Sequence, residues 1–190
     1  KYMSQCGYCS RREADRLIEK GEVWINGTLA TMGTKVMPGD TVMVHHTTIT
    51  PCQKEYLLAF HKPAGIVCTT SKIDKNNVID YLNFPERIYP VGRLDKESTG
   101  LLLLTNNGQL MDDVLRGSNY HEKEYIVHVN KPITDSVLQA MAQGVPILDT
   151  ITRPCKIRRM GKDCFYITLT QGLNRQIRRM CEYFDYRVTS

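Results

Sequence analysis

A polar, aperiodic stretch at residues 45–54, with the sequence HHTTITPCQK, divides this chain into two unequal parts. Each part carries its own periodic pattern of apolar residues, so each is expected to fold around a separate core. We therefore predict a small domain at residues 1–47, a linker at 48–53 and a larger domain at 54–190.

The N-terminal part has strong signals for one helix and one hairpin. Ser10 and Glu13 form a capping box, which predicts a helix over residues 11–20. Residues 23–25 are typical of a short strand, and the following Asn26-Gly27 pair is the strongest two-residue hairpin signal. A compact helix and hairpin module is the expected result.

Three arginines lie close together on this short helix: Arg11, Arg12 and Arg16. A basic helix beside a tight hairpin suits contacts with an RNA backbone. The same pattern also fits a stabilised amphipathic helix whose charges face only solvent. The residues alone leave both interpretations open.

The larger part alternates strands and helices without a regular βαβ period. Strands are predicted at 56–60, 66–69, 101–105, 125–129, 151–157 and 165–170, and helices at 78–82, 110–115, 135–143 and 175–184. This pattern favours an α+β fold with a mixed, mostly antiparallel central sheet flanked by helices.

Charge is concentrated near the end of the chain. The net charge is +5, and residues 151–190 alone carry 9 basic and 3 acidic side chains. Such a segment indicates a polyanionic partner such as nucleic acid, or a solvated basic face. The longest apolar run, residues 101–104, is too short for a membrane span, so no membrane association is expected.

Cysteine usage argues against both disulfides and a metal site. Seven cysteines are scattered along the chain, which favours a reducing cytosol and predicts a cytoplasmic protein. Cys6 and Cys9 have the spacing of half a zinc site but lack a second ligand pair. We interpret them as packing residues and predict no metal.

The segment Pro90 to Asp95, PVGRLD, places an Arg and an Asp two residues apart on a predicted loop. A loop before the buried strand at 101–105 is a place where a rigid scaffold can present reactive groups. An isolated Asp more often caps a turn, and spacing alone favours that interpretation.

The sequences of four segments, in their order along the chain, resemble the motifs of one family. Residues 91–108, VGRLDKESTGLLLLTNNG, resemble the signature of the RsuA-type RNA pseudouridine synthases, in which the Asp is catalytic. FHKPAG at 60–65, KEY at 123–125 and QGLNRQIRRM at 171–180 resemble the other family motifs, in the same order. Residues 10–27 and 37–44 resemble the ribosomal-protein S4-like RNA-binding domain.

The resemblance assigns roles to individual residues. Asp95 is implied as the catalytic residue, and attack on C1′, addition to C6 and removal of a sugar proton all stay open. Arg178 is implied as its ionic partner, with Arg175 as the alternative. Tyr125 would stack on the flipped uracil, and Arg93 would fill the space that the base leaves or clamp its phosphate.

The remaining predicted contacts are to the RNA backbone. These RNA-binding residues are Arg11, Arg12, Arg16, Lys62, Arg175 and Arg179. The isomerisation of uridine needs neither metal nor cofactor, and none is expected. We also expect a monomer, and the resemblance implies a further strand and tail beyond Ser190.

The predicted function is site-specific isomerisation of uridine in structured RNA of a bacterium. HEKEY and GLNRQIRRMCE most resemble family members that act on large-subunit rRNA, which indicates 23S rRNA as the substrate. Two alternatives are kept: a catalytically silent RNA-binding or ribosome-assembly protein, and a related synthase that acts on 16S rRNA or tRNA.

Overall fold

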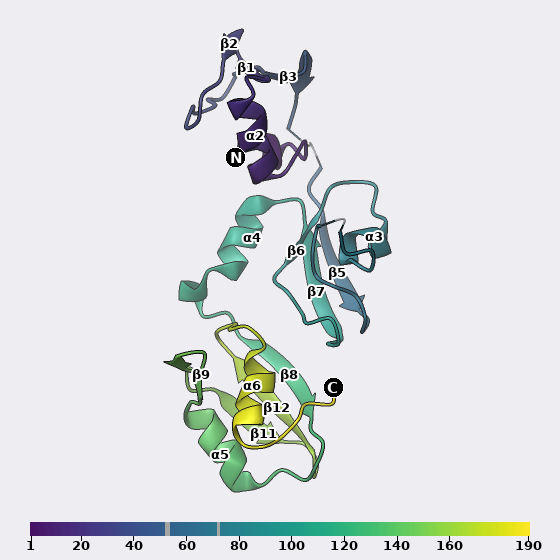
Figure 1. Cartoon of the computed structure of the whole chain (residues 1–190), viewed down its shortest axis with the longest axis vertical. Coiled ribbons are helices and arrows are strands. Elements are labelled where there is room, and N and C mark those ends of the chain that lie inside the picture. The colour runs from purple at the N-terminus through teal and green to yellow at the C-terminus, as the bar shows by residue number, and fades with distance from the viewer. Residues whose placement is uncertain (52–53, 72) are drawn as a thin grey trace.

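A computed structural model describes residues 1–51, 54–71 and 73–190, which form three bodies along one long axis (Figure 1). The first body holds two helices and a four-stranded antiparallel sheet of order β2-β1-β3-β4. Its elements are α1 (Tyr2–Gln5), α2 (Arg11–Glu19), β1 (Val23–Ile25), β2 (Thr28–Leu29), β3 (Val42–Val44) and β4 (Thr47–Ile49).

The predicted helix and hairpin of this body are confirmed. The Ser10 hydroxyl accepts a hydrogen bond from the Glu13 backbone N–H at 3.1 Å, which caps α2. Asn26 and Gly27 have φ of 50° and 78°, the left-handed pair that a two-residue β1–β2 turn requires. Cys9 is buried in the core of this body and Cys6 packs against it, as the packing interpretation predicted.

The predicted linker at 48–53 is partly wrong, because Thr48 and Ile49 belong to β4. Strand β4 follows β3 through a second tight turn, in which His45 and His46 have φ of 46° and 64°. Ile49 is buried and closes the core of the first body. Residues 52 and 53 lie outside the described residues.

The second body is an antiparallel sheet of order β5-β7-β6 with two helices. Its elements are β5 (Leu57–Lys62), α3 (Val78–Leu82), β6 (Tyr89–Val91), β7 (Gly100–Thr105) and α4 (Gly108–Leu115). Strand β6 was not predicted because it contains Pro90. Proline is tolerated here because β6 is an edge strand and pairs only with β7.

The third body is an antiparallel sheet of order β11-β12-β8, with a two-stranded ribbon, two α-helices and one short 3-10 helix. Its elements are η1 (Gly117–Asn119), β8 (Lys123–His128), α5 (Asp135–Gln143), β9 (Pro146–Ile147), β10 (Thr150–Ile151), β11 (Lys156–Arg159), β12 (Cys164–Leu169) and α6 (Gln176–Tyr183). The strand predicted at 151–157 is divided into β10 and β11, because Pro154 has no N–H to pair.

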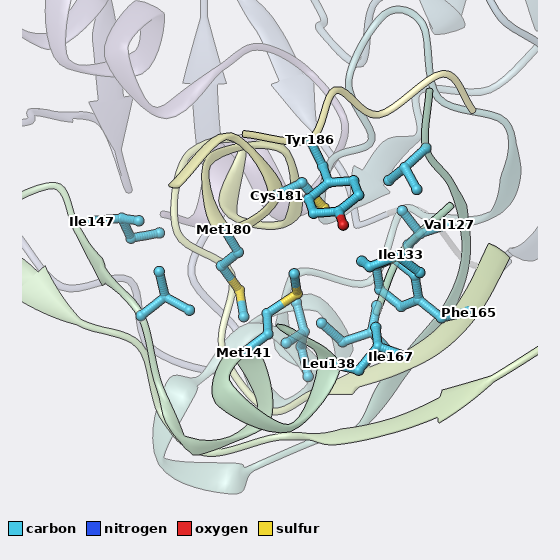
Figure 2. Close-up of a cluster of buried hydrophobic side chains, with 13 residues drawn as sticks. Val127, Ile133, Leu138, Met141, Ile147, Phe165, Ile167, Met180, Cys181 and Tyr186 are labelled. Atoms are coloured by element: carbon cyan, nitrogen blue, oxygen red, sulfur yellow. The ribbon is translucent and has the colours of Figure 1, made fainter. Parts of the chain in front are cut away.

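The largest core lies between this sheet and its two helices (Figure 2). Phe165 and Ile167 of β12 are fully buried there, together with Met141 of α5 and Met180 of α6. The side chains of these elements point into one cluster in Figure 2, which fixes α6 against the sheet. The position of α6 matters because it carries two of the predicted site arginines.

The predicted α+β class with antiparallel pairing is confirmed, although the central sheet consists of two three-stranded parts. The prediction of a strand at 66–69 is wrong. Val67 forms only an isolated parallel bridge with Asn77, because its backbone bonds with residues 76 and 78 rather than with a sheet. Within the described part of the chain, no helix has the length and apolar character that a membrane span requires.

Candidate active site

A cleft of about 720 Å³ lies between the second and third bodies. Its lining comes mainly from three segments that are far apart in the sequence: residues 93–99, 125–128 and 171–178. Four of the residues predicted to act on the substrate, Arg93, Asp95, Tyr125 and Arg178, line this one cleft. The fold therefore brings together the residues that the sequence singled out.

The centre of the cleft is an ion pair between Asp95 and Arg178. Arg178 Nε donates to Asp95 Oδ2 at 3.3 Å, and this contact joins residues 83 positions apart. The Arg178 side chain is 16% exposed, which shields the pair from solvent and strengthens it. The ion pair therefore fixes the position of the Asp95 carboxylate within the cleft.

Arg175 is a second cation beside the same carboxylate. Its Nη1 lies 3.7 Å from Asp95 Oδ2 and 3.8 Å from Glu97 Oε2. The Arg175 side chain is 44% exposed, and its longer contacts are shared between two carboxylates. The geometry thus favours Arg178 over Arg175 as the main partner of Asp95.

Tyr125 lies on β8 opposite Ile167 and is half-buried at the cleft wall. Burial raises the pKa of its hydroxyl, and the negative charge of Asp95 raises that pKa further. The phenol therefore stays protonated and can donate a hydrogen bond. Arg93 is exposed at the cleft, where its guanidinium can reach a ligand.

Lys62 stabilises the loop that carries Asp95 through hydrogen bonds to backbone carbonyls. The Lys62 side chain is fully buried, and its Nζ donates to the carbonyl oxygens of Pro63 at 2.8 Å, Ser98 at 2.8 Å and Lys96 at 3.3 Å. Burial lowers the pKa of this amine. Lys62 is therefore corrected from a predicted RNA contact to a buried support of the loop, because its ammonium has no access to a phosphate.

Further backbone contacts fix the same loop. Gly65 N–H donates to the Lys96 carbonyl at 2.7 Å, and Leu94 N–H donates to Cys68 Sγ at 3.4 Å. Gly92 starts the loop with a φ of 91°, a conformation that favours glycine. These contacts hold Asp95 at a defined position before substrate binds.

The other predicted RNA-binding arginines have different surroundings. Arg179 donates to the Asn174 carbonyl at 3.0 Å, so it stabilises the turn before α6. Arg11 lies 3.7 Å from Asp112 of α4, across the boundary between the first and second bodies. Arg12 and Arg16 are exposed on α2, where Arg16 also pairs with Glu13 at 3.4 Å.

Two polar features of the cleft were not found from the sequence. Glu97 shares Arg175 with Asp95, and the buried Gln176 accepts from the Leu173 N–H at 3.0 Å and so shapes the turn before α6. The burial of Lys62 had a signal in the sequence. Alternation along β5 places it on the same face as Leu58 and Phe60, which pack in the core.

Metal ligands are not gathered anywhere in the part of the chain that the structure describes, since no group of three or more His, Cys, Asp or Glu side chains could hold an ion.

Comparison with known proteins assigns the chain to a family. A family model described as RNA pseudouridylate synthase matches residues 56–183, and a model described as S4 domain matches residues 1–42. The chain belongs to the RNA pseudouridylate synthase family. The membership predicted from the four ordered segments, and the S4 domain before them, are thereby confirmed.

Relatives with assigned names agree with this family. The chain is 53% identical over 190 residues to the dual-specificity RNA pseudouridine synthase RluF of Escherichia coli strain K12, a match that covers 99% of this chain and 66% of that protein. It is 32% identical over 198 residues to the ribosomal large subunit pseudouridine synthase B of Bacillus subtilis strain 168, where the match covers 99% and 80%. The chain thus spans just under two thirds of the RluF relatives.

A solved structure supports the fold. A crystal structure of a pseudouridylate synthase superposes on this chain with a TM-score of 0.69 at 24% identity, covering 100% of this chain and 84% of the other. This likeness concerns the fold alone.

Proposed function

We propose that this protein converts uridine to pseudouridine at a specific site in structured RNA, with 23S rRNA as the substrate and Asp95 as the catalytic residue. The observation that carries this proposal is the 3.3 Å ion pair between Asp95 and Arg178 within a cleft that Tyr125 also lines. A catalytically silent family member has no need to keep a charged carboxylate at such a place.

The reaction is an isomerisation in which atoms and charge balance within the substrate. The bond between N1 of uracil and C1′ breaks, and a bond between C5 and C1′ forms. A proton leaves C5 and a proton is taken up at N1. A carboxylate can supply the nucleophile or the base for this chemistry, and the hydrogen bond from Arg178 would hold the Asp95 carboxylate in place within the cleft.

The substrate base must first leave the stack of its RNA helix. Extrusion costs a few kcal/mol, which stacking on an aromatic ring partly offsets. Tyr125 and exposed Arg93 both line the cleft, which supports a role for Tyr125 in stacking on the flipped uracil and for Arg93 in contacting its phosphate or filling the vacated position.

The substrate assignment draws on the relatives. The Bacillus subtilis relative is named for the ribosomal large subunit, and the RluF relatives are named dual-specificity enzymes. A 23S rRNA substrate places the protein in the cytoplasm of a bacterium. Mass-tagged mapping of pseudouridine in RNA from cells that lack the gene tests this assignment. Loss of a site in 23S rRNA is expected, whereas loss only in 16S rRNA or tRNA, or no loss at all, would contradict it.

The two arginines beside Asp95 are expected to differ in their effect on turnover. Arg178→Gln should lower kcat about 30-fold, because it removes a largely buried, charge-assisted hydrogen bond that is worth about 2 kcal/mol. Arg175→Gln should lower kcat less than about fivefold, because its ion pairs are longer and more exposed. Single-turnover assays measure both. Equal losses in the two variants would contradict the assignment of Arg178.

The arginines of α2 are expected to contribute to RNA affinity alone. Arg12→Ala combined with Arg16→Ala should weaken binding and reduce the slope of log K against log salt by about two, since two phosphate contacts are lost. Turnover at saturating RNA should persist. Lys131→Ala combined with Lys162→Ala removes the same charge from exposed positions in the third body and is the control. The prediction fails if both pairs change the salt slope equally.

A further inference from the structure

The connection between α4 and β8 ends in an exposed tyrosine with an unusual backbone. Tyr120 follows the short 3-10 helix η1 and has φ of 50° and ψ of 32°, in the left-handed region. Bulky residues rarely adopt this conformation. The residue is also 58% exposed. An exposed aromatic residue in an unusual backbone conformation suggests a functional role, such as contact with a ligand.

One face of the Tyr120 ring is covered by Arg153. The guanidinium carbon of Arg153 lies 4.4 Å from the ring centroid, which is stacking distance. Arg153 is itself fixed, because its Nη1 donates to the Thr170 carbonyl at 3.2 Å and its backbone N–H donates to the Gln171 side chain. Arg153 therefore covers one face of the ring and is itself fixed by hydrogen bonds, while more than half of the Tyr120 surface is exposed to solvent.

The stacked pair is attached to the wall of the cleft. Gln171 lines the cleft and accepts from the Arg153 backbone, and the Gln176 side chain at the start of α6 donates to the same Gln171 oxygen at 3.4 Å. Helix α6 carries Arg178, the partner of Asp95. Tyr120 is thus connected through Arg153, Gln171 and Gln176 to the helix that carries Arg178.

The segment around Tyr120 is of mixed charge, and the cation that contacts its ring is Arg153. Arg116 and Lys123 are exposed close to it in sequence, as are Glu122 and Glu124, and Glu122 is paired with Lys156 at 2.6 Å. Proteins that hold single-stranded nucleic acid combine basic side chains with an aromatic ring on which a base stacks. The Tyr120 and Arg153 pair has this combination.

We propose that Tyr120, backed by Arg153, is a stacking platform for the base of a nucleotide that flanks the target uridine. The platform would make Tyr120 a residue that determines which RNA site is accepted. This inference rests on the proposed function and adds a second aromatic contact outside the position of the flipped uracil. Since the contact involves a flanking base, it affects binding of RNA and leaves the chemical step unchanged.

Tyr120→Asn is the test variant, because asparagine tolerates the left-handed backbone and cannot replace the ring. With 23S rRNA transcript that contains 5-tritiated uridine, we expect KM to rise about tenfold, as loss of one stacked base implies, and kcat to stay within twofold. Tyr120→Phe should restore the wild-type KM, because phenylalanine keeps the stacking face. Tyr81→Ala removes a tyrosine that is 57% exposed on α3 and is the matched control.

The site of stacking can be observed directly. After the target uridine has been mapped with the wild-type protein, RNA hairpins carrying 2-aminopurine on either side of it report stacking by fluorescence quenching. Wild type and Tyr120→Phe should quench one of the two positions, and Tyr120→Asn should not.

The outcomes separate this inference from the proposed function. If wild type is active and Tyr120→Asn changes neither KM nor quenching, the platform is overturned while the proposed function stands. A KM rise that Tyr120→Phe and Tyr81→Ala show equally would also overturn it. Absence of tritium release by the wild type would instead contradict the proposed function itself.

Discussion

We expect Asp95→Asn to abolish pseudouridine formation while the fold and RNA affinity stay close to those of the wild type. Asparagine is nearly isosteric with aspartate, but it supplies neither the negative charge nor a nucleophile of comparable strength. The side chain is 32% exposed at the cleft and lies outside the hydrophobic cores, so its replacement should not unfold the protein.

Tritium release from 5-tritiated uridine measures this loss, because C5 gives up its hydrogen when the new carbon–carbon bond forms. We expect a rate more than about a thousandfold below wild type, which corresponds to ~4 kcal/mol of transition-state stabilisation. Glu97→Gln is the matched control, because it neutralises a carboxylate on the same loop that is 60% exposed and also pairs with Arg175. The control should stay active. A smaller loss in Asp95→Asn would show that this residue is not the essential catalyst.

The second large effect is expected at Lys62. Lys62→Met should lower the free energy of unfolding by about 3 kcal/mol, because the partly buried carbonyls of Pro63 and Ser98 lose their donor. The Lys96 carbonyl does not lose every partner, because it still accepts a hydrogen bond from the Gly65 N–H. Turnover should fall as well, because the loop that carries Asp95 loses its support. Urea unfolding and single-turnover assays measure the two effects.

The pH dependence of stability distinguishes this role from simple packing. Burial holds the pKa of Lys62 below its ordinary value of 10.5, so the folded state binds fewer protons than the unfolded state just below that pH. The stability difference between wild type and Lys62→Met should therefore widen as the pH rises toward 10.5. Lys75→Met, at an exposed position, should change neither stability nor turnover. A Lys62→Met protein as stable and active as this control would refute the supporting role.

Much of the candidate site could be predicted because its residues lie in short, distinctive segments. Asp95, Tyr125 and Arg178 were each identified from a short sequence motif, and the fold brings all three to one cleft. The bounds of α3 and α5 were also predictable, since caps and apolar spacing mark both ends. These are properties that neighbouring residues determine.

The errors concern features that depend on distant partners. The burial of Lys62 depends on carbonyls more than thirty positions away, at Lys96 and Ser98. The β3–β4 turn uses a His-His pair, which lacks the usual Asn or Gly signal for left-handed residues. Strand β6 was missed because it contains Pro90, which a strand tolerates here only because β6 lies at the edge of its sheet. Apart from the alternation along β5, which places Lys62 on the face of Leu58 and Phe60, local patterns do not carry this information.

The catalytic role proposed for Asp95 in forming pseudouridine can be tested on the natural type of substrate. The most direct measurement is nucleoside analysis of unmodified 23S rRNA transcript after incubation with the purified protein, in which chromatography separates pseudouridine from uridine. We predict that the wild type produces pseudouridine at a single site up to the molar amount of the transcript, and that Asp95→Asn produces none. Absence of pseudouridine with the wild type, or its formation by Asp95→Asn at a comparable rate, would contradict the account.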